Sequence, residues 1–292
     1  MENRPRVVFL IPIASARAVA DWHLGCSYLR QTLASIFNSS NGDFRVVVAG
    51  HETPDFELPK DPRFKFISLP HTNHSEAFNT YADKQRDKMA KLSAAWNYAK
   101  ATWNPQYVMK IDWDDFISSK LVDWLSTAKD ESGYCIKDGW FWESGSRLLI
   151  QQTEKFDERC GSCLIIRHDL ADLQGPFLTL QGEGGHRIID HRSLVPGAET
   201  SSLLLNDCHN RAEAQFGYLG HQLAIVPFRA AIYRIRSTIS MSQTGMVTKI
   251  HSLRWLLGRI RRTRLITPSL RREFCLGFDR ILITHHTRNN RG

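Results

Sequence analysis

The chain has 292 residues, of which 42% are hydrophobic and 23% are charged, as is typical of a soluble globular protein. No apolar stretch approaches the roughly 20 residues that a membrane-spanning helix needs. The formal net charge is +8, and segment 249–272 alone contains eight basic residues and no acidic residue. The rest of the chain is therefore neutral, which indicates one localised contact with an anionic partner.

Six cysteines show no disulfide-framework spacing, so we expect a reducing, cytoplasmic compartment. Cys160 and Cys163 form a single Cys-x-x-Cys at the start of an apolar run, and a zinc site would need a second such pair or nearby histidines. Buried strand cysteines are the simpler interpretation. The N-terminal run 7–14 is interrupted by Pro12, which favours a first buried strand over a short signal peptide.

The first hundred residues alternate between strand and helix patterns. Apolar runs predict strands over 7–11, 44–49 and 64–69, and helical spacing of apolar residues predicts helices over about 28–37 and 83–103. The order strand, helix, strand predicts a parallel sheet with right-handed crossovers.

The helix predicted over 83–103 carries Lys84, Lys88 and Lys91 at i, i+4 and i+7, which places the three lysines along one face. Such a face is either a solvated surface or a row of cations that points at phosphate. The second interpretation gains support because this helix leads directly into an acidic stretch.

An apolar run at 107–111 is followed without a spacer by Asp112, Asp114 and Asp115; we call residues 112–115 the acidic turn. A strand over 107–111 places these carboxylates at its carboxyl end, where open α/β sheets bind ligands. Crowded carboxylates repel one another and lose solvation. We therefore expect compensation by a divalent ion, or by lysines and arginines from elsewhere in the chain.

The second half of the chain has a less regular pattern. A helix with Leu121, Val122 and Leu125 is expected to be capped by Ser118 or Ser119. Short β-like stretches, separated by glycines, predict smaller mixed strands at the edge of the parallel core; they cover 133–142, 147–151 and 162–167. A glycine-rich loop follows at 182–185, and a last apolar run covers 224–236. The histidines at 186, 191, 209 and 221 are too scattered to define a ligand set.

These patterns resemble the family 2-like, GT-A-fold glycosyltransferases, which use nucleotide sugars. The matching pieces are strands 7–12 and 44–52, the Asp87-Lys88 to Lys91 helix, the Asp112-Trp-Asp114 turn after its strand, and segment 160–170. The resemblance covers roughly residues 5–240, and its most specific part is the Asp-x-Asp context. It implies a GT-A, Rossmann-like α/β domain with a mixed, mostly parallel sheet flanked by helices.

The resemblance also implies how the donor binds. A UDP-, GDP- or dTDP-linked sugar is expected at the carboxyl ends of the first strands, and an Mn²⁺ or Mg²⁺ ion is expected on Asp112 and Asp114. The residues expected to contact the nucleotide sugar are Pro12, His51, Glu52, Lys88, Lys91 and Asp112. Arg234 and Arg236 are alternative contacts for the diphosphate, which we do not favour.

The reaction that the resemblance implies is transfer of the sugar to an acceptor hydroxyl, with inversion at the sugar carbon. In inverting members a carboxylate removes the acceptor proton. We expect Glu183 in this role, because it follows segment 177–181 much as the family's catalytic acid follows the acceptor strand, with Asp190 as the alternative. The chain departs here from the family's usual Glu-Asp pair.

We expect two regions, a GT-A domain over 1–240 and a basic, helical extension over 241–292. Ile250, Leu253, Leu257 and Ile260 form a helical apolar stripe beside arginines. Residues 249–272 are therefore expected either to lie on an anionic membrane, at its inner surface, or to pack as a helix against the domain. An enzyme held at a membrane would act on a glycan or lipid-linked saccharide. No nucleic-acid module is recognisable, so no nucleic acid is expected.

Two rival functions remain. A nucleotidyltransferase acting on sugar phosphates would also place carboxylates beside a diphosphate, but it predicts a glycine-rich loop after the first strand, and Ile11–Arg17 contains no glycine. A non-enzymatic basic protein that binds membranes or nucleic acid would need the acidic turn only as structure.

Overall fold

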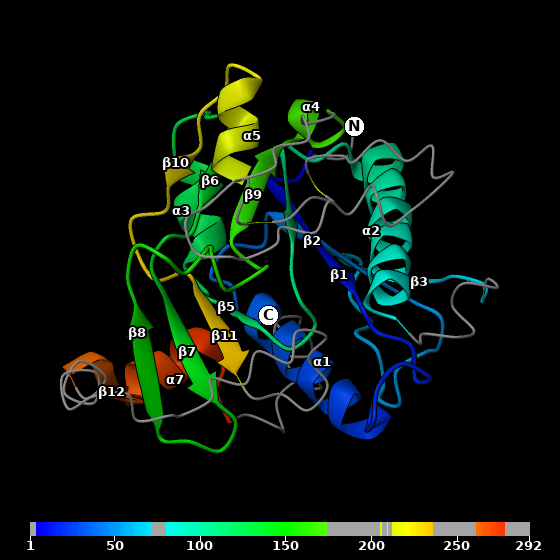
Figure 1. The fold of residues 1–292 in the computed structure, drawn as a ribbon, viewed down its shortest axis with the longest axis horizontal. Helices are drawn as coiled ribbons and strands as arrows, with labels where there is room; N and C mark the ends of the chain where they lie inside the picture. Colours follow the sequence, from blue (N-terminus) through cyan, green and yellow to red (C-terminus); the bar gives the residue numbers. More distant parts are fainter. Residues whose placement is uncertain are drawn as a thin grey trace, which may run out of the picture.

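The computed structural model describes residues 4–71, 80–173, 205, 209, 212–235 and 261–277. They form two β-sheets with helices packed around them (Figure 1). The larger sheet has seven strands in the order β10-β6-β9-β4-β1-β2-β3. Its strands are β1 (Val7–Pro12), β2 (Phe44–Gly50), β3 (Phe64–Ser68), β4 (Tyr107–Lys110), β6 (Gly133–Cys135), β9 (Leu164–Arg167) and β10 (Ala224–Ile225).

The centre of the larger sheet is parallel, as expected. Strand β1 pairs in parallel with both β2 and β4, and β2 pairs in parallel with β3, whereas β9 runs antiparallel to β4 and β6. Every residue of β1 is buried, which is typical of a parallel strand covered on both faces. Because Pro12 lies opposite Ala49 and Leu10 opposite Lys110, the carboxyl ends of β1, β2 and β4 meet at one edge.

Two long helices cover this sheet, α1 (Trp22–Phe37) and α2 (Tyr81–Trp103). Buried side chains of α1, such as Leu29 and Leu33, and of α2, such as Trp96, join the strands in one core. Helix α2 starts at a capping box in which Thr80 and Asp83 exchange hydrogen bonds. The helix predicted over 83–103 is therefore confirmed, with a start two residues earlier.

The short strands of the second half divide between two sheets, which differs from the expected extension of one edge. Strands β6, β9 and β10 join the larger sheet, but a separate five-stranded sheet has the order β12-β8-β7-β11-β5. These strands are β5 (Phe116–Ile117), β7 (Gly139–Glu143), β8 (Leu148–Gln152), β11 (Ala231–Ile235) and β12 (Thr263–Leu265). The reason lies in their aromatic residues: Trp140 and Trp142 pack with Phe116 in a small core of their own.

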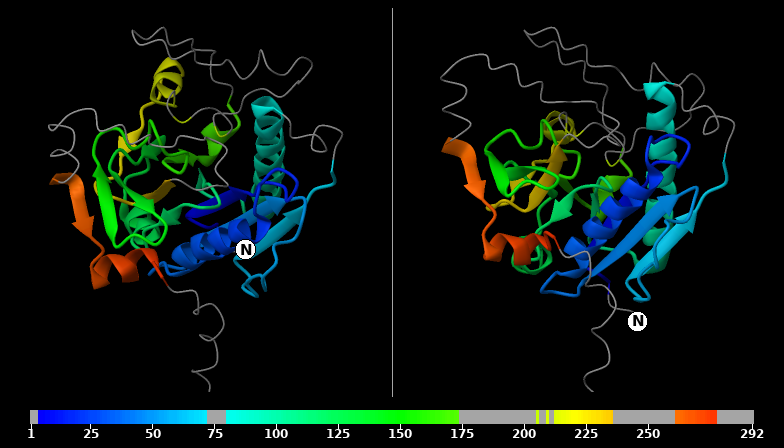
Figure 2. Two further views of the ribbon diagram at one scale, coloured as in Figure 1. Left: turned by 60° about the horizontal axis from the view of Figure 1, so that its bottom comes forward. Right: turned by 90° about the horizontal axis from the view of Figure 1, so that it is seen from below.

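The described part of the basic extension packs against the domain. Strand β12 pairs antiparallel with β8, and α7 (Pro268–Phe274) buries Phe274 in the small core (Figure 2). The helix expected over 249–272 is wrong at 263–265, because these residues form strand β12 through their pairing with β8. Thr267 caps a new helix that begins at Pro268. The predicted stripe at 250–260 lies outside the described residues.

Three shorter helices complete the description: α3 (Leu121–Thr127), α4 (His168–Ala171) and α5 (Ala212–Tyr218). The expected serine cap of α3 is wrong, because its N-cap residue is Lys120 and no side chain caps the helix. The hydroxyl of Ser118 instead donates to Glu273 Oε1 at 2.6 Å, which ties the chain before α3 to α7.

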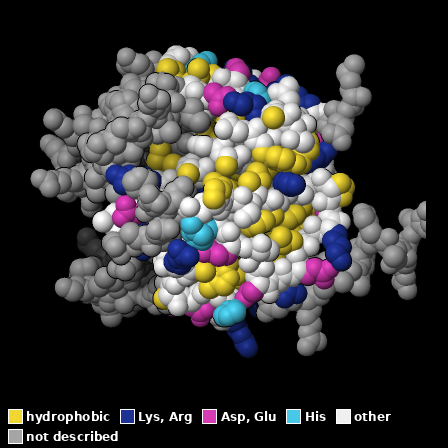
Figure 3. Space-filling view, turned by 90° about the vertical axis from the view of Figure 1, so that its right-hand side faces the viewer, with side chains coloured by type: hydrophobic (Ala, Val, Ile, Leu, Met, Phe, Trp, Pro, Cys, Tyr) yellow, Lys and Arg dark blue, Asp and Glu magenta, His cyan; other side chains and the backbone are white. Residues whose placement is uncertain are grey.

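Strand β3 is the edge strand of the larger sheet at the end opposite to β10. Figure 3 shows hydrophobic side chains gathered in the middle of the face at this end, with charged side chains around them. Phe64 and Phe66 of β3 are only partly buried and pack against the core. Within the described ranges, no helix is long and apolar enough to cross a bilayer. The five described cysteines are free thiols, and Cys160 and Cys163 are buried just before β9.

A close contact between α1 and the acidic turn generates a stability prediction. A Cβ atom added to Gly25 would lie 2.2 Å from Trp113 Cη2, so Gly25→Ala forces the indole ring to move. We expect this substitution to lower the free energy of unfolding by about 2 kcal/mol, because overpacking a close-packed core costs about 1–3 kcal/mol. Gly217→Ala in α5 is the matched control, because its added methyl meets nothing within 4 Å. Urea unfolding should show the control unchanged or up to about 1 kcal/mol more stable.

Candidate functional site

The acidic turn is fixed at the carboxyl end of β4 by contacts from two other parts of the chain. The hydroxyl of Thr32 in α1 donates to the Trp113 carbonyl at 3.0 Å. The hydroxyl of Ser162, just before β9, accepts the Asp112 N–H at 2.8 Å and donates to Asp115 Oδ2 at 2.6 Å. The turn therefore has a defined backbone position.

Asp115 is the internal anchor of the turn and is completely buried. Its carboxyl group accepts from the Ser162 hydroxyl, from the Cys160 thiol at 3.3 Å and from the Arg234 N–H at 3.2 Å. Burial raises its pKa well above the usual range, and the charges of Asp114 and Asp112 raise it further. Asp115 therefore supports the turn from inside and does not face a ligand.

Asp112 is paired with a lysine of α2. Lys88 Nζ lies 2.5 Å from Asp112 Oδ1, and Lys88 remains about 26% exposed. On the other side, a Cβ atom at Gly161 would lie 2.8 Å from Asp112 Oδ2, so the carboxylate is seated against a glycine backbone. Burial opposes ionisation of Asp112, but Lys88, Lys110 and His209 outweigh it and lower its pKa. Asp112 is thus an ionised carboxylate with one oxygen on a partly exposed lysine.

A second cation lies beneath the turn. Arg234 of β11 is 1% exposed, and its Nε donates to the Asp114 carbonyl at 3.0 Å. Its guanidinium group lies 3.8 Å from the centre of the Tyr28 ring and also donates to Gln31 Oε1 at 2.9 Å. Burial lowers the pKa of Arg234, and the charge of Asp114 opposes that shift. The side chain is therefore a buried support for the turn, and Arg236 lies outside the described residues.

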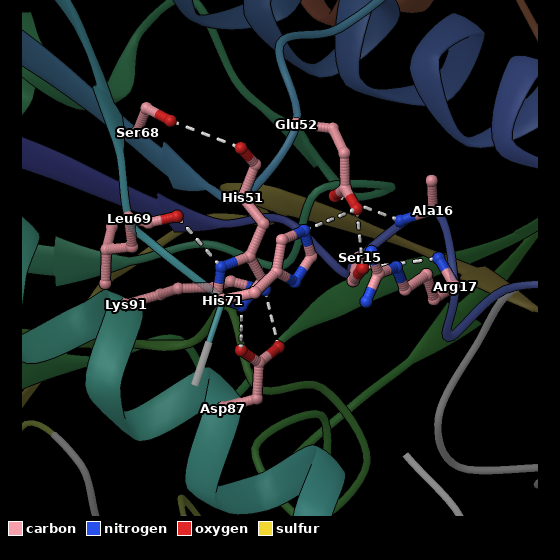
Figure 4. Close-up of polar contacts among 10 residues, drawn as sticks. All are labelled: Ser15, Ala16, Arg17, His51, Glu52, Ser68, Leu69, His71, Asp87 and Lys91. Atoms are coloured by element: carbon pink, nitrogen blue, oxygen red, sulfur yellow. Dashed lines mark hydrogen bonds and ion pairs between the residues drawn. The ribbon is translucent and has the colours of Figure 1, made fainter. Parts of the chain in front are cut away.

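The ends of β2 and β3 meet α2 in a nearly buried polar group (Figure 4). His51 Nε2 lies 2.6 Å from Asp87 Oδ1, and His51 Nδ1 lies 3.0 Å from the Leu69 carbonyl. Lys91 Nζ donates to Asp87 Oδ2 at 2.5 Å and is 0% exposed. Burial lowers the pKa of Lys91, although Asp87 opposes this shift. Lys91 therefore holds Asp87, which in turn orients His51.

Glu52 forms the solvent-facing side of the same region. It accepts from the Ser15 hydroxyl at 2.8 Å and from the Ala16 N–H at 3.1 Å, and it lies 3.3 Å from His71 Nε2 (Figure 4). The His71 ring stacks on His51 with 4.4 Å between ring centres. Burial tends to raise the pKa of Glu52, but the Ser15 and Ala16 hydrogen bonds and His71 lower it. Glu52 is thus an ionised acceptor that is still partly open to solvent.

The residues predicted from sequence occupy three kinds of position. Glu52, Lys88 and Asp112 are partly accessible at the shared edge of β1, β2 and β4, and Asp114 is a nearly buried neighbour in the turn. Pro12, His51 and Lys91 lie beneath that surface, with Pro12 as the buried last residue of β1. Glu183 and Asp190 lie outside the described residues.

Sequence reasoning did not select two further basic residues. Lys110, the last residue of β4, lowers the pKa of Asp112, and its position directly before the acidic turn was a usable signal. His209 also influences Asp112, and it contacts the Asp157 carbonyl through Nδ1. Nothing in the spacing of the histidines indicates this proximity, because Asp112 and His209 are far apart in the sequence.

Asp112 and Asp114 are the expected ligands of a divalent cation. Among the described residues, no three or more His, Cys, Asp or Glu side chains are arranged to hold a metal ion. A magnesium ion, however, is commonly held by one or two carboxylates together with substrate phosphates and water. Asp112, which is 28% exposed, and its nearly buried neighbour Asp114 are the two carboxylates of the turn that could take part in such a site.

Comparisons with known proteins give distant likenesses. No protein-family model matches the chain, and no curated protein matches it. Among solved structures, S. aureus TarS (residues 1–349) is similar at 13% identity and a TM-score of 0.45, with 78% of this chain covered. The chain spans 60% of that structure's chain.

A second similar structure is 2-C-methyl-D-erythritol 4-phosphate cytidylyltransferase from Thermus thermophilus. Its identity is 15% and its TM-score is 0.33, with 87% of this chain and 98% of that chain covered. Scores of this size do not distinguish between functions, so we base the functional proposal on the side chains of the site.

The two lysines of α2 should respond differently to removal of their charge. Lys91→Met leaves Asp87 with one partner fewer in a buried place, so we expect the free energy of unfolding to fall by about 3 kcal/mol. Lys88→Met affects a partly exposed ion pair and should cost about 1 kcal/mol or less. Urea unfolding of both variants is the measurement. Equal losses would contradict the assignment of Lys91 as internal support and Lys88 as an accessible cation.

Glu52 generates a prediction about pH. Its pKa in the folded protein is below the ordinary value of 4.5, so its stabilising effect is complete above pH 4.5 and is lost as the pH falls through the lowered value. Glu52→Gln should therefore be about 1 kcal/mol less stable than the wild type at pH 7, and this difference should shrink at more acidic pH. Unfolding at a series of pH values tests this, with the exposed Glu158→Gln as control.

Proposed function

We propose that this chain is a metal-dependent, inverting glycosyltransferase that moves a sugar from a nucleotide-diphosphate sugar to a glycan or lipid-linked saccharide. One observation supports this proposal above the others: the ionised acceptor Glu52 and the ion pair of Asp112 with the partly exposed Lys88 lie at the same edge of the parallel sheet. A nucleoside diphosphate needs both: a hydrogen-bond acceptor for the nucleoside, and cations or a metal site for the diphosphate.

In this proposal Glu52 accepts hydrogen bonds from the N–H or O–H groups of the nucleoside. The Ser15 hydroxyl and Ala16 N–H hold its carboxylate in place, and the stacked pair of His51 and His71 lies beside it. Asp87 fixes the orientation of His51. A carboxylate that is already ionised and oriented loses little conformational freedom when it binds the nucleoside.

The diphosphate would bind at the acidic turn. Asp112 and Asp114 would hold a magnesium or manganese ion, which stabilises the negative charge that develops on the leaving nucleoside diphosphate. Lys88 would then exchange its bond with Asp112 for one with a phosphate oxygen. Lys110, whose charge already acts on Asp112, adds a second cation at this position. These fixed charges favour departure of the diphosphate because they are oriented before the bond breaks.

The acceptor hydroxyl needs a base on the opposite side of the sugar. We assign this role to Glu183, with Asp190 as the alternative, on the resemblance of the surrounding segment to the family pattern. The base would take the acceptor proton as the oxygen attacks the sugar carbon, and the nucleoside diphosphate would leave with the electrons of the broken bond.

A nucleotide panel tests the donor and metal parts of the proposal. We expect UDP, GDP or dTDP to raise the melting temperature in the presence of Mn²⁺, by about 5 °C at a hundred times the Kd, and by much less in its absence. Asp114→Asn should abolish the Mn²⁺-dependent part. The exposed Asp123→Asn in α3 is the matched control and should respond like the wild type. No response to any nucleotide would contradict the proposal.

Lys88→Met refines the same experiment because it separates metal binding from phosphate binding. Without the competing ammonium group, the nucleotide-free variant should bind Mn²⁺ more tightly than the wild type, while its affinity for the nucleotide diphosphate falls. Product analysis distinguishes the rival enzyme: a glycosyltransferase releases a nucleoside diphosphate, whereas a nucleotidyltransferase releases pyrophosphate. Release of pyrophosphate from a nucleoside triphosphate would favour the rival.

A further inference from the structure

The rim of the smaller sheet carries an exposed apolar pair. Strand β12 is the edge strand of this sheet, and Leu265 lies directly opposite Leu148 of β8. Leu265 is 68% exposed and Leu148 is 42% exposed, which makes them two of the four large, exposed hydrophobic residues in the described structure. Directly opposed residues on neighbouring strands have adjacent side chains, so the two leucines form one apolar projection.

Exposed arginines flank this pair in the chain. The rim is defined here as Leu148, Leu265 and the exposed arginines at positions 147, 261 and 262. Segment 261–272 contains no acidic residue, and Glu143, at the start of the β7–β8 connection, is exposed near the pair. The neighbouring Glu273 is bonded to Ser118 and, at 2.7 Å, to Lys120. The rim is therefore strongly positive around its apolar projection.

The position of the rim leaves it open to a large partner. In Figure 1, β12 lies at the outer margin of the molecule next to β8, and α7 runs behind β7 and β8. Helix α7 covers the side of the sheet that carries Leu149, whereas Leu148 and Leu265 project from the other side. The arginines make a second copy of the chain an unfavourable partner at this edge, because like charges would face each other.

We infer that this rim is a docking surface for an anionic membrane, with Leu148 and Leu265 inserted among the lipids and the arginines on the headgroups. Charge complementarity selects an anionic surface, and the leucine pair selects a lipid one, since a soluble polyanion offers nothing for exposed leucines to enter. Each basic residue brought to an anionic membrane strengthens binding by roughly fivefold. This inference does not depend on the proposed transferase activity.

Sedimentation of the full chain with vesicles tests the surface. We expect binding to vesicles of phosphatidylcholine with 40% phosphatidylglycerol, and binding at least tenfold weaker to pure phosphatidylcholine. Leu148→Ser with Leu265→Ser should weaken binding to the anionic vesicles by about tenfold. Arg147→Gln, Arg261→Gln and Arg262→Gln together should weaken it by about a hundredfold. Equal binding to both vesicle types would overturn the inference.

Matched variants separate this surface from general charge and from misfolding. Ile225→Ser removes an exposed hydrophobic residue at β10, and the combination of Lys60→Gln, Lys129→Gln and Lys155→Gln removes three exposed charges elsewhere; neither should change vesicle binding. Lysines in place of the three arginines should retain binding, because they keep the charge. Thermal melting confirms that each variant is folded.

A polyanion is the outcome that competes with a membrane. If heparin or polyphosphate binds as tightly as anionic vesicles, and if the leucine variants bind these vesicles like the wild type, the surface is a polyanion site and the inference is wrong. Loss of vesicle binding in the leucine variants, with polyanion binding unchanged, would support it.

Discussion

The ion pair between Lys88 and Asp112 is the contact on which the proposed site depends. It joins the middle of α2 to the residue that follows Ile111 at the end of β4. It also answers the electrostatic problem that three neighbouring aspartates create. Asp112 is balanced by Lys88 and Lys110, Asp114 lies over Arg234, and burial together with the other two charges favours the protonated form of Asp115. The protein thus supplies its own cations in place before any ion binds.

Helix α2 connects the two halves of the proposed site because neighbouring residues on a helix point about 100° apart. Asp87 and Lys91, four residues apart, lie on one face and hold His51, whereas Lys88 points to the acidic turn. One rigid helix therefore sets the position of the polar group at β2 and of the cation at β4. The distance between the two halves is fixed by backbone geometry, which is what a ligand with two joined recognition groups requires.

Local sequence patterns predict individual strands and helices, but they do not predict which distant strands pair. The largely apolar strands β1 and β2, the helix α2 and the strand before Asp112 follow from hydrophobic periodicity. The second sheet does not, because its pairing joins β7 near residue 140 to β11 near residue 233 and β8 to β12, and no local pattern specifies such partners. For the same reason the i, i+3 spacing of Lys88 and Lys91 did not reveal that only Lys88 is accessible. Burial of Arg234 was equally hidden, since the ring of Tyr28 that covers it is more than two hundred positions away.

The smaller sheet also explains how the basic rim is attached to the acidic turn. Phe116 of β5 directly follows Asp115, and it packs with Phe274 and Leu276 in the small core. Glu273 bonds to Ser118 on the same short stretch of chain, and Arg234 reaches the turn from the middle of this sheet. The rim and the turn are therefore two sides of one packed unit rather than a domain and a loose tail. The pairing of β12 with β8 and the packing of Phe274 on Phe116 thus tie a surface on the rim to the strand that follows the acidic turn.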